Sequence, residues 1–447
     1  MSGNFDPRLE EIISELNNRW PENKIEPSLD RIKLLLDYLG NPQETFRSIH
    51  IAGTNGKTST SRMIDSLLRS FGIRTGRYTS PHLENIRERI SLNGELITPE
   101  FFIYTYDDIK PYIELVDEKS EHSLSYFEVL TAMAYAAFAD APIDVGVIEC
   151  GVGGAWDATN VIDSEVAVMT PIGLDHQEYL GDTISAIAQT KAGIFRSGKP
   201  AVLAHQTREA SEVLIRESAH LESIPLREGL DFSLIHRDVA VGGQLLSIQG
   251  LGGIYEDIFL PLYGRHQASN ATLALTAVEA FLGGGKERLD VELVRDGFAQ
   301  ATSPGRLEVV RRNPTVIIDA AHNPHGAVAL KEALSEEFAF DRVIAIVAML
   351  GDKDVTNFLM EIHQVVDEII VTENSSPRAM PTEQLFKIAT EIFEEEQVTS
   401  AGSIMRAIEM AMDKASHPNQ SSQSIGILVT GSVITAGQVR TLLKRSA

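Results

Sequence analysis

The residues from Gly53 to Ser59 have the types and the order that hold the phosphates of a nucleotide. They read Gly-Thr-Asn-Gly-Lys-Thr-Ser and follow an apolar, strand-like run. Glycines let backbone N–H groups turn toward phosphate oxygens. The lysine can neutralise the outer phosphates, and a following hydroxyl can reach Mg²⁺. A plain turn before a helix is the alternative. We expect a nucleoside triphosphate to bind at Gly53, Thr54, Asn55, Gly56, Lys57, Thr58 and Ser59.

Three further side chains could work beside that loop. Glu149 ends an apolar run, and an acid at the carboxyl end of a parallel strand beside a phosphate loop is placed to hold Mg²⁺. His176 follows the next apolar run, where metal binding competes with a solvated or structural role. Lys191 closes an otherwise apolar helix face, and its simplest interpretation is a lysine that extends to the surface. For Glu149, the alternative is a solvated acid.

Polar residues also end several strand-like runs in the C-terminal third of the chain. Asp319 ends one run and is followed closely by His322, Asp352 follows a second, and Ser432 follows a third. Each of them alone could be a helix cap, since Asp, Ser and Asn are preferred there. Three polar strand ends in one small sheet indicate a functional site instead.

The elements that position these residues alternate between strand and helix, which predicts parallel sheets with right-handed crossovers. A Ser-Pro-Gly break at 303–305 divides an N-terminal domain, 1–301, from a C-terminal domain, 302–447. Residues 224–262 predict β-hairpins that decorate the N-terminal sheet. Two helices are expected in residues 1–46 around a break at 21–27, and a hairpin around 93–94. Expected helices are 99–117, 126–139, 183–195, 267–283 and 290–300; expected strands are 47–52, 74–79, 143–148, 165–170, 200–204, 315–319, 342–349, 368–372 and 424–430.

The bulk composition narrows the class of protein. The 447 residues carry a formal net charge of −24, which argues against a nucleic-acid or anionic-membrane surface. No secretion signal is visible at the N-terminus, and no apolar stretch is long enough to cross a bilayer. A single cysteine, Cys150, excludes an intramolecular disulfide. We expect a cytoplasmic monomer that binds neither nucleic acid nor membrane.

Several motifs together resemble the folate-metabolising branch of the Mur ligase superfamily, the folylpolyglutamate synthases that are often also dihydrofolate synthases. The similarity extends in order from about residue 29 to 443. The resemblance implies a P-loop ATPase domain of the Mur ligase type, followed by a smaller Rossmann-like α/β domain. The motifs are 53–59, 79–83 (Thr-Ser-Pro-His-Leu), 88–94, 157–160 (Asp-Ala-Thr-Asn), 191–195 and 319–325.

The resemblance also implies a reaction. ATP phosphorylates an acceptor carboxylate, and the amine of L-glutamate displaces the phosphate. The acceptor would be dihydropteroate or a reduced folate. The implied contacts are Ser80 and Glu149 for a first Mg²⁺, His176 for a second, and a carbamylated Lys191; Asn270, Arg306 and Asp319 for the nucleotide; His322 and Ser432 for glutamate; and Ser125, Phe127 and Asp157 for the pterin.

Some positions depart from the family pattern. Thr58 stands where many folate enzymes have glycine, and Ala155-Trp156 stand where the family commonly has Arg-Leu. Three alternatives remain at this point: a folylpolyglutamate synthase alone, a cell-wall Mur ligase, and a nucleotide-dependent switch. The second usually carries a UDP-binding domain before the phosphate loop, and the third needs a base-reading Asn-Lys-x-Asp loop. Neither feature is found in this sequence.

Overall fold

The strands expected around the phosphate loop form one sheet in the computed structural model, which describes residues 6–21, 24, 26–416 and 424–446. The first five residues, where no secretion signal is visible, lie outside that part, as do residues 22–23 and 25 of the expected N-terminal break. The sheet contains β1 (Arg47–Ala52), β2 (Thr75–Tyr78), β3 (Ile90–Leu92), β4 (Glu95–Leu96), β5 (Val145–Glu149), β6 (Val166–Met169), β7 (Pro200–Leu203) and β8 (Ile224–Arg227).

The order of this sheet is β4-β3-β2-β5-β1-β6-β7-β8. All neighbours from β2 to β8 are parallel, as the strand–helix alternation predicts. The expected hairpin at 93–94 joins β3 to β4, and this pair adds antiparallel strands at one edge. Because β1 and β5 are neighbours in the same direction, the phosphate loop after β1 and Glu149 at the end of β5 share one edge of the sheet.

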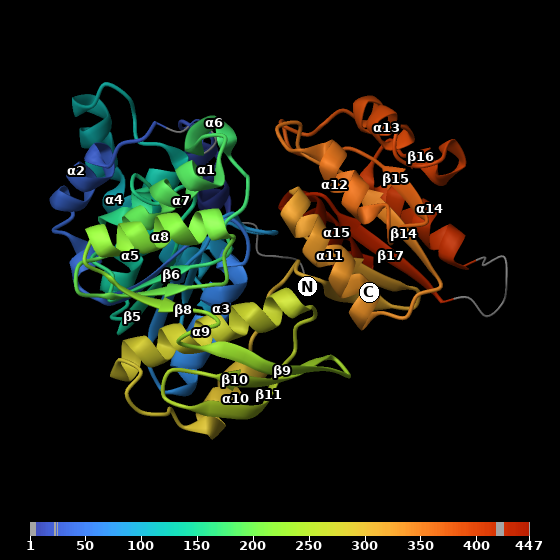
Figure 1. Ribbon diagram of the computed structural model, residues 1–447. Coiled ribbons are helices and arrows are strands. Elements are labelled where there is room, and N and C mark those ends of the chain that lie inside the picture. Colours follow the sequence, from blue (N-terminus) through green and yellow to red (C-terminus); the bar gives the residue numbers. More distant parts are fainter. Residues whose placement is uncertain (1–5, 22–23, 25, 417–423, 447) are drawn as a thin grey trace.

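Helices cover both faces of the sheet (Figure 1). Ile49 and Ile51 of β1 pack with α3, α9 and α10, while Ala52 packs with α7 and α8 on the other face. This follows from the two-residue period of a strand. The helices of this part are α1 (Pro7–Asn17), α2 (Asp30–Tyr38), α3 (Lys57–Ser70), α4 (Pro99–Lys119), α5 (Tyr126–Asp140), α6 (Gln177–Leu180), α7 (Ile184–Lys191), α8 (Arg208–His220), α9 (Arg265–Gly283) and α10 (Val291–Ala299), with short 3₁₀ turns η1 (Pro42–Glu44), η2 (Ile86–Arg89), η3 (Ala158–Val161) and η4 (Ala192–Ile194).

The expectation for residues 224–262 is only partly met. The strands β9 (Ser233–Ala240), β10 (Gly243–Gln249) and β11 (Ile254–Leu260) do form an antiparallel meander. However, they make a separate sheet, which packs against α9 and α10. The prediction is wrong for β8, which is a parallel edge strand of the main sheet. An alternating pattern specifies a strand but not its partner.

A second lobe follows (Figure 1), built on a six-stranded sheet with the order β12-β13-β17-β14-β15-β16. Its strands are β12 (Glu308–Arg312), β13 (Thr315–Ile318), β14 (Arg342–Val347), β15 (Glu368–Val371), β16 (Val398–Ser400) and β17 (Ile425–Thr430). Its helices are α11 (Pro324–Glu337), α12 (Val355–Ile362), α13 (Thr382–Thr390), α14 (Ile404–Ser416) and α15 (Val433–Ser446), with the 3₁₀ turn η5 (Glu395–Gln397).

The edge strands β12 and β16 were not expected from the sequence, and β12 is antiparallel to its neighbour. The other four strands are those that the sequence predicts. The domain boundary expected at 301/302 lies in the connection between α10 and β12 and stays a prediction. Among the residues that the structure describes, no helix is long and apolar enough to cross a membrane.

Candidate active site

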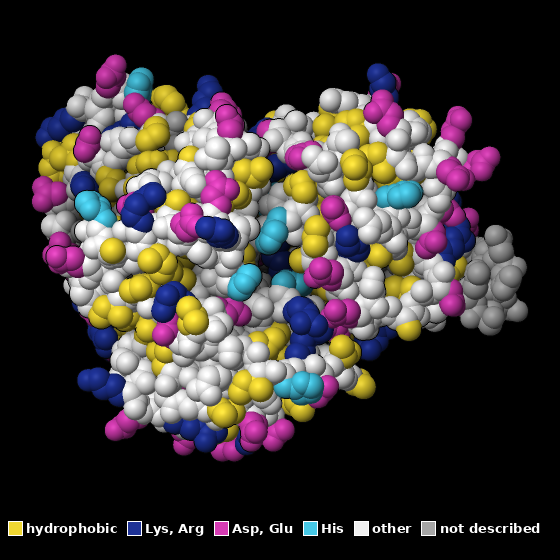
Figure 2. Space-filling view, in the orientation of Figure 1, with side chains coloured by type: hydrophobic (Ala, Val, Ile, Leu, Met, Phe, Trp, Pro, Cys, Tyr) yellow, Lys and Arg dark blue, Asp and Glu magenta, His cyan; other side chains and the backbone are white. Residues whose placement is uncertain are grey.

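A cleft of about 1680 Å³ lies between the two lobes, and every site residue expected from the sequence lines it. Figure 2 shows the hollow, with histidine and basic side chains along it. The phosphate loop enters the cleft from the end of β1. The strand ends of the six-stranded sheet face it from the other lobe. The fold therefore brings together residues that are up to several hundred positions apart in the chain.

Two glycines of the phosphate loop have no room for a side chain. Gly53 has a φ of +143°, and a Cβ there would lie 1.9 Å from Oγ1 of Thr170. Gly56 has a φ of +89°, and a Cβ there would lie 2.6 Å from Oδ1 of Asn270. Gly56 immediately precedes α3, whose N-terminal N–H groups face the loop. The loop can therefore approach phosphates closely, as a nucleotide site requires.

The three side chains after Gly56 hydrogen-bond to different partners. Nζ of Lys57 donates to the carbonyl oxygens of Gly53 and Thr54, at 3.1 and 3.2 Å. Thr58 donates to Oε1 of Glu149 at 2.9 Å. Ser59 is buried and hydrogen-bonds to Ser303. Of the two hydroxyls considered for Mg²⁺, only that of Thr58 lies beside the acid at the end of β5.

Glu149 is a buried carboxylate with one oxygen to spare. Burial raises its pKa, while the charge of Lys57 and the bonds from Thr58 and the Ser80 backbone act in the opposite direction. Its Oε2 atom has no hydrogen-bond partner among the residues that the structure describes. A buried, unpaired carboxylate oxygen is costly unless a cation or donor meets it. The position therefore fits a divalent cation held by Glu149 and Ser80.

No three His, Cys, Asp or Glu side chains gather around a point where they could hold a metal, in the described part of the chain. Such a cage is not what Mg²⁺ needs. Mg²⁺ is commonly held by one or two carboxylates together with water and substrate phosphates. The donors present at the phosphate loop, one carboxylate and neighbouring hydroxyls, fit that chemistry.

Lys191 and His176 both have unusual environments. Lys191 is only 5% exposed, and its Nζ donates to the carbonyl oxygen of Gly53 at 2.8 Å. Burial, with the nearby charge of Lys57, lowers its pKa to about 7. The interpretation of Lys191 as a surface lysine is wrong. His176 has a φ of +51°, and its side chain is 38% exposed at the cleft. Partial loss of hydration between the cleft walls nevertheless lowers the pKa of its imidazole to about 4, although Asp175 acts the other way. A neutral imidazole is the form that binds metals.

The nucleotide candidates from the rest of the chain line the same cleft, and Asn270 lies against the loop itself. Oδ1 of Asn270 is the atom that a Cβ on Gly56 would meet, and its amide donates to Gln267 at 3.2 Å. Asp319 accepts backbone N–H groups from Ala321 and Leu307, at 2.8 and 2.9 Å. Burial raises the pKa of Asp319, and the charge of Arg306 opposes this. The two hydrogen bonds to Asp319 thus hold the backbone at the end of β13 in place within the cleft.

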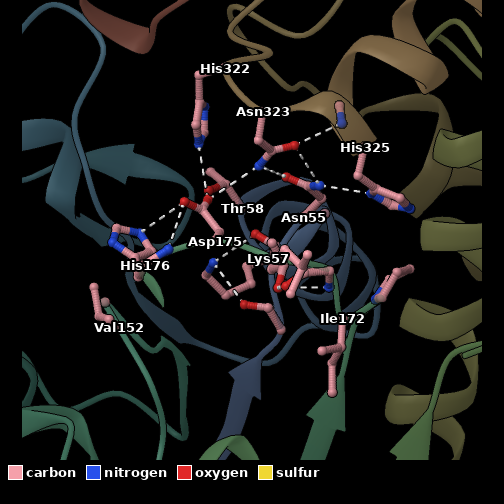
Figure 3. Close-up of a pocket in the computed structure, with 18 of the residues that line it drawn as sticks. Asn55, Lys57, Thr58, Val152, Ile172, Asp175, His176, His322, Asn323 and His325 are labelled. Atoms are coloured by element: carbon pink, nitrogen blue, oxygen red, sulfur yellow. Dashed lines mark hydrogen bonds and ion pairs between the residues drawn. The ribbon is translucent and has the colours of Figure 1, made fainter. Parts of the chain in front are cut away.

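Asp175 joins the two lobes, and sequence reasoning missed this role (Figure 3). Its carboxylate accepts from Lys353 at 2.7 Å and from Asn323 at 3.2 Å, and lies 3.5 Å from Nε2 of His322. Burial opposes ionisation, but His322, His176 and Lys353 hold the pKa of Asp175 far below its usual range. Three side chains of the C-terminal lobe therefore converge on one acid of the N-terminal lobe.

The two glutamate candidates lie on the C-terminal side. His322 also has its Nδ1 atom 3.0 Å from the carbonyl oxygen of Ala320, so Nδ1 carries a hydrogen. The hydroxyl of Ser432 accepts from the backbone of Ile434 at 3.1 Å. Ser432 does act as a local cap, as the alternative interpretation holds, and it lines the cleft as well.

The pterin candidates Phe127 and Asp157 lie at the turn after β5, and Ser125 begins the helix that carries Phe127. The hydroxyl of Ser125 caps α5, accepting from Glu128 at 3.2 Å. The ring of Phe127 packs over Gly151, where a Cβ would lie 2.7 Å from it. Asp157 is buried and caps η3. Trp156 also lines the cleft, and sequence reasoning noted it only as a departure from the family pattern.

Comparison with known proteins agrees over the whole chain. The Mur ligase middle domain matches residues 51–278, and the Mur ligase glutamate ligase domain matches residues 305–433. The chain is 50% identical over 451 residues to the dihydrofolate synthase/folylpolyglutamate synthase of Mycobacterium tuberculosis, covering 96% of this chain and 93% of that protein.

Solved structures give the same result. That of Mycobacterium tuberculosis folylpolyglutamate synthase complexed with ADP has a TM-score of 0.94, 49% identity and 98% coverage of both chains. An Escherichia coli structure in complex with DHPP and ADP has a TM-score of 0.84, 31% identity and 98% coverage of both chains. The predicted α/β fold class and ADP-forming ligase class are confirmed. The chain therefore belongs to the dihydrofolate synthase/folylpolyglutamate synthase family of the Mur ligases.

Proposed function

We propose that this enzyme uses ATP to join L-glutamate to dihydropteroate and to the glutamyl tail of a reduced folate. The observation that carries the proposal is the single cleft in which the phosphate loop, the pterin candidates and the glutamate candidates all lie. The names of the relatives support the two activities: the Mycobacterium tuberculosis relative is called a dihydrofolate synthase/folylpolyglutamate synthase, and an Escherichia coli structure holds DHPP with ADP.

The reaction that this cleft suits has two steps. A carboxylate oxygen of the acceptor attacks the γ-phosphorus of ATP, and ADP leaves. The amine of glutamate then attacks the acyl carbon of the acyl phosphate. Inorganic phosphate leaves, the amine loses a proton and an amide results. Phosphoryl transfer depends chiefly on positioning and charge neutralisation, and a closed cleft protects the acyl phosphate from water.

The donors at the phosphate loop support the metal assignments. Glu149 would hold a first Mg²⁺ through its unpartnered Oε2 atom, with Ser80 beside it, and His176 would hold a second. When bound, Mg²⁺ supplies charge neutralisation on the phosphates. Lys57 adds a cation from the protein, and the backbone of Gly53–Gly56 adds N–H donors.

Lys191 is proposed to carry a carbamate. A lysine with a pKa of about 7 has a substantial neutral fraction at physiological pH. Its amine can then attack CO₂, forming an N–C bond and releasing a proton. The product is an anion where a buried cation stood, and Lys57 lies close enough to favour that change electrostatically.

The remaining candidates bind the organic parts of the substrates. Asn270, Arg306 and Asp319 would contact the nucleotide, and His322 and Ser432 the incoming glutamate. Ser125, Phe127 and Asp157 would contact the pterin, the phenyl ring by stacking and the carboxylate by accepting N–H groups. We also propose that the enzyme is a monomer and that it acts in the cytoplasm.

Purified enzyme with ATP and glutamate tests the proposal against three acceptors: dihydropteroate, tetrahydrofolate and a UDP-muramoyl peptide. ADP release and the mass of the product are measured for each. We expect glutamylated products from the first two and none from the third. Activity with tetrahydrofolate alone would reduce the function to that of a folylpolyglutamate synthase, and activity with the muramoyl peptide alone would contradict the proposal.

A further inference from the structure

A chain of buried hydrogen bonds connects the central strand of the main sheet to Asp157. Nε2 of His50, in the middle of β1, lies 2.9 Å from Oγ1 of Thr159, and that hydroxyl lies 2.5 Å from Oδ1 of Asp157. His50 and Thr159 are both 0% exposed, and Asp157 is 4% exposed. The three side chains therefore form one buried hydrogen-bond network, and of the three only Asp157 lines the cleft.

The direction of the hydrogen bonds follows from counting donors. The carboxylate of Asp157 accepts backbone N–H groups from Val152 at 2.8 Å and from Thr159 at 3.0 Å, with a further one from Gly151. Burial raises the pKa of Asp157, and these bonds act against that rise. Because the backbone groups that meet the carboxylate are all donors, the hydroxyl of Thr159 donates to Oδ1 as well. That uses the only hydrogen on the hydroxyl. Nε2 of His50 must then carry a hydrogen and donate to Oγ1 of Thr159.

The unused nitrogen of the histidine supports the same order. Nδ1 of His50 has no partner among the residues that the structure describes. If the chain ran the other way, Nε2 would accept and this buried Nδ1 would carry a hydrogen without an acceptor, the more costly arrangement. Burial lowers the pKa of His50 to about 3, so the ring is neutral and has one N–H only.

The contacts of Cys150 do not change the directions of these hydrogen bonds. Its sulfur lies 3.0 Å from Nε2 of His50 and 3.6 Å from Oγ1 of Thr159. Burial raises the pKa of the thiol well above its usual range, so sulfur stays protonated. A thiol is a weak acceptor and a weak donor. It can share the N–H of His50 without replacing the oxygen.

We infer that His50 is a positioning residue for pterin binding: its Nε2–H orients the Thr159 hydroxyl, which donates to Asp157 and so positions that carboxyl group as an acceptor for the N–H groups of the pterin ring. This inference rests on the proposed role of Asp157 in the function above. His50 touches no substrate and acts only through Thr159. His50 therefore contributes indirectly to recognition of the acceptor, although it lies in β1, the strand that precedes the phosphate loop.

Replacing the donor tests the inference. His50→Met fills similar space without an N–H and should raise the KM for dihydropteroate roughly tenfold. His50→Gln can place its amide N–H near the position of Nε2 and should restore most of the affinity. In both variants kcat at saturating dihydropteroate and the KM for ATP should stay within about twofold of wild type, because the lost interaction is one of binding.

Three controls separate positioning from damage to the strand. Ile49→Val removes a methylene from the opposite face of β1 and should lower the melting temperature without changing either KM. Thr159→Val should match His50→Met, and the double variant should be no worse than either single one. The inference is wrong if His50→Met raises the KM for ATP as much as it raises the KM for dihydropteroate. It is also wrong if His50→Gln does not restore the affinity for dihydropteroate.

The outcome also separates this inference from the proposed function. If Asp157→Ala impairs dihydropteroate use while His50→Met leaves it unchanged, the inference fails and the function stands. If wild-type enzyme does not use dihydropteroate at all, the proposed dual function fails. In that case the tautomer of His50 still tests the inference, and its ¹⁵N chemical shifts, assigned by comparison with His50→Gln, report that tautomer. A hydrogen on Nε2 supports the network, and a hydrogen on Nδ1 overturns it.

Discussion

At the scale of single residues, burial changes what a side chain can do. Lys191 illustrates this, since a lysine that is 5% exposed and close to Lys57 has a pKa of about 7 instead of its usual value above 10. The sequence shows a lysine on an apolar helix face and cannot show how deeply it is buried. His176 is similar, because its pKa depends on neighbours that only the fold supplies.

Lys191→Ala should abolish turnover, because no carbamate can form without the amine. ATP binding and the melting temperature should stay close to wild type, and isothermal titration with ATP and thermal denaturation measure these. Short carboxylic acids should restore part of the activity by replacing the missing anion. An alanine variant with full activity would show that the carbamate is not needed.

Asp319→Ala and His322→Ala should affect different substrates. If Asp319 contacts the nucleotide, its loss should mainly raise the KM for ATP, by about tenfold. If His322 contacts glutamate, its loss should mainly raise the KM for glutamate. Steady-state kinetics with each substrate varied in turn measure both. The reverse pattern would exchange the two assignments.

At the scale of elements, the position of Glu149 could be predicted because parallel strands end at one edge of a sheet. The apolar runs that form β1 and β5 are long enough to identify, and the phosphate loop follows one of them. The short strand β16 and the partly exposed edge strand β12 lack such runs and were missed. The separate sheet of β9–β11 could not be predicted, since its partners are set by packing against α9 and not by its own alternation.

Gly56→Ala tests the geometry of the phosphate loop. The new methyl group would meet Oδ1 of Asn270 at 2.6 Å, and the φ of +89° disfavours any side chain. We expect the KM for ATP to rise by at least about tenfold. Gly72→Ala is the matched control, because its φ is +75° but nothing lies within 4 Å of the added atom. It should cost stability only, and an equal loss of ATP affinity in both variants would contradict this account.

At the scale of the whole molecule, several groups of contacts hold the lobes around the cleft, and two of them centre on acidic residues of the N-terminal lobe. One is the pairing of Asp175 with Lys353 and Asn323. The other joins Glu84 to α15, where a Cβ on Gly437 would collide with the backbone of the N-terminal lobe. Asp175 and Lys353 are 178 positions apart, and no periodicity in the sequence encodes such a pair. The cleft could be expected from the sequence, but these contacts could not.

Glu84→Gln should weaken the second of these contacts. Burial alone would raise the pKa of Glu84, but hydrogen bonds from Lys444, Thr441 and Arg440 lower it below its ordinary value. Its stabilising effect is therefore fully present above about pH 4.5 and is lost as the pH falls through the lower folded value. We expect the variant to melt roughly 2–4 °C below wild type at neutral pH.

The same difference should disappear in acid. Thermal denaturation of both proteins from about pH 7 to about pH 3 measures it, since protonated Glu84 and glutamine are both neutral. A difference in melting temperature that stays constant across this range would show that the charge of Glu84 does not contribute to the contact between the lobes.

The central claim is that ATP activates the carboxylate of dihydropteroate for attack by glutamate. The most direct measurement uses dihydropteroate labelled with ¹⁸O in its carboxylate, together with ATP and L-glutamate. Mass spectrometry then follows both the inorganic phosphate and the glutamylated product. The account predicts glutamylated product and one ¹⁸O atom transferred to each phosphate, because the carboxylate oxygen that attacks the phosphorus leaves with it. Phosphate without label, or the absence of glutamylated product, would contradict it.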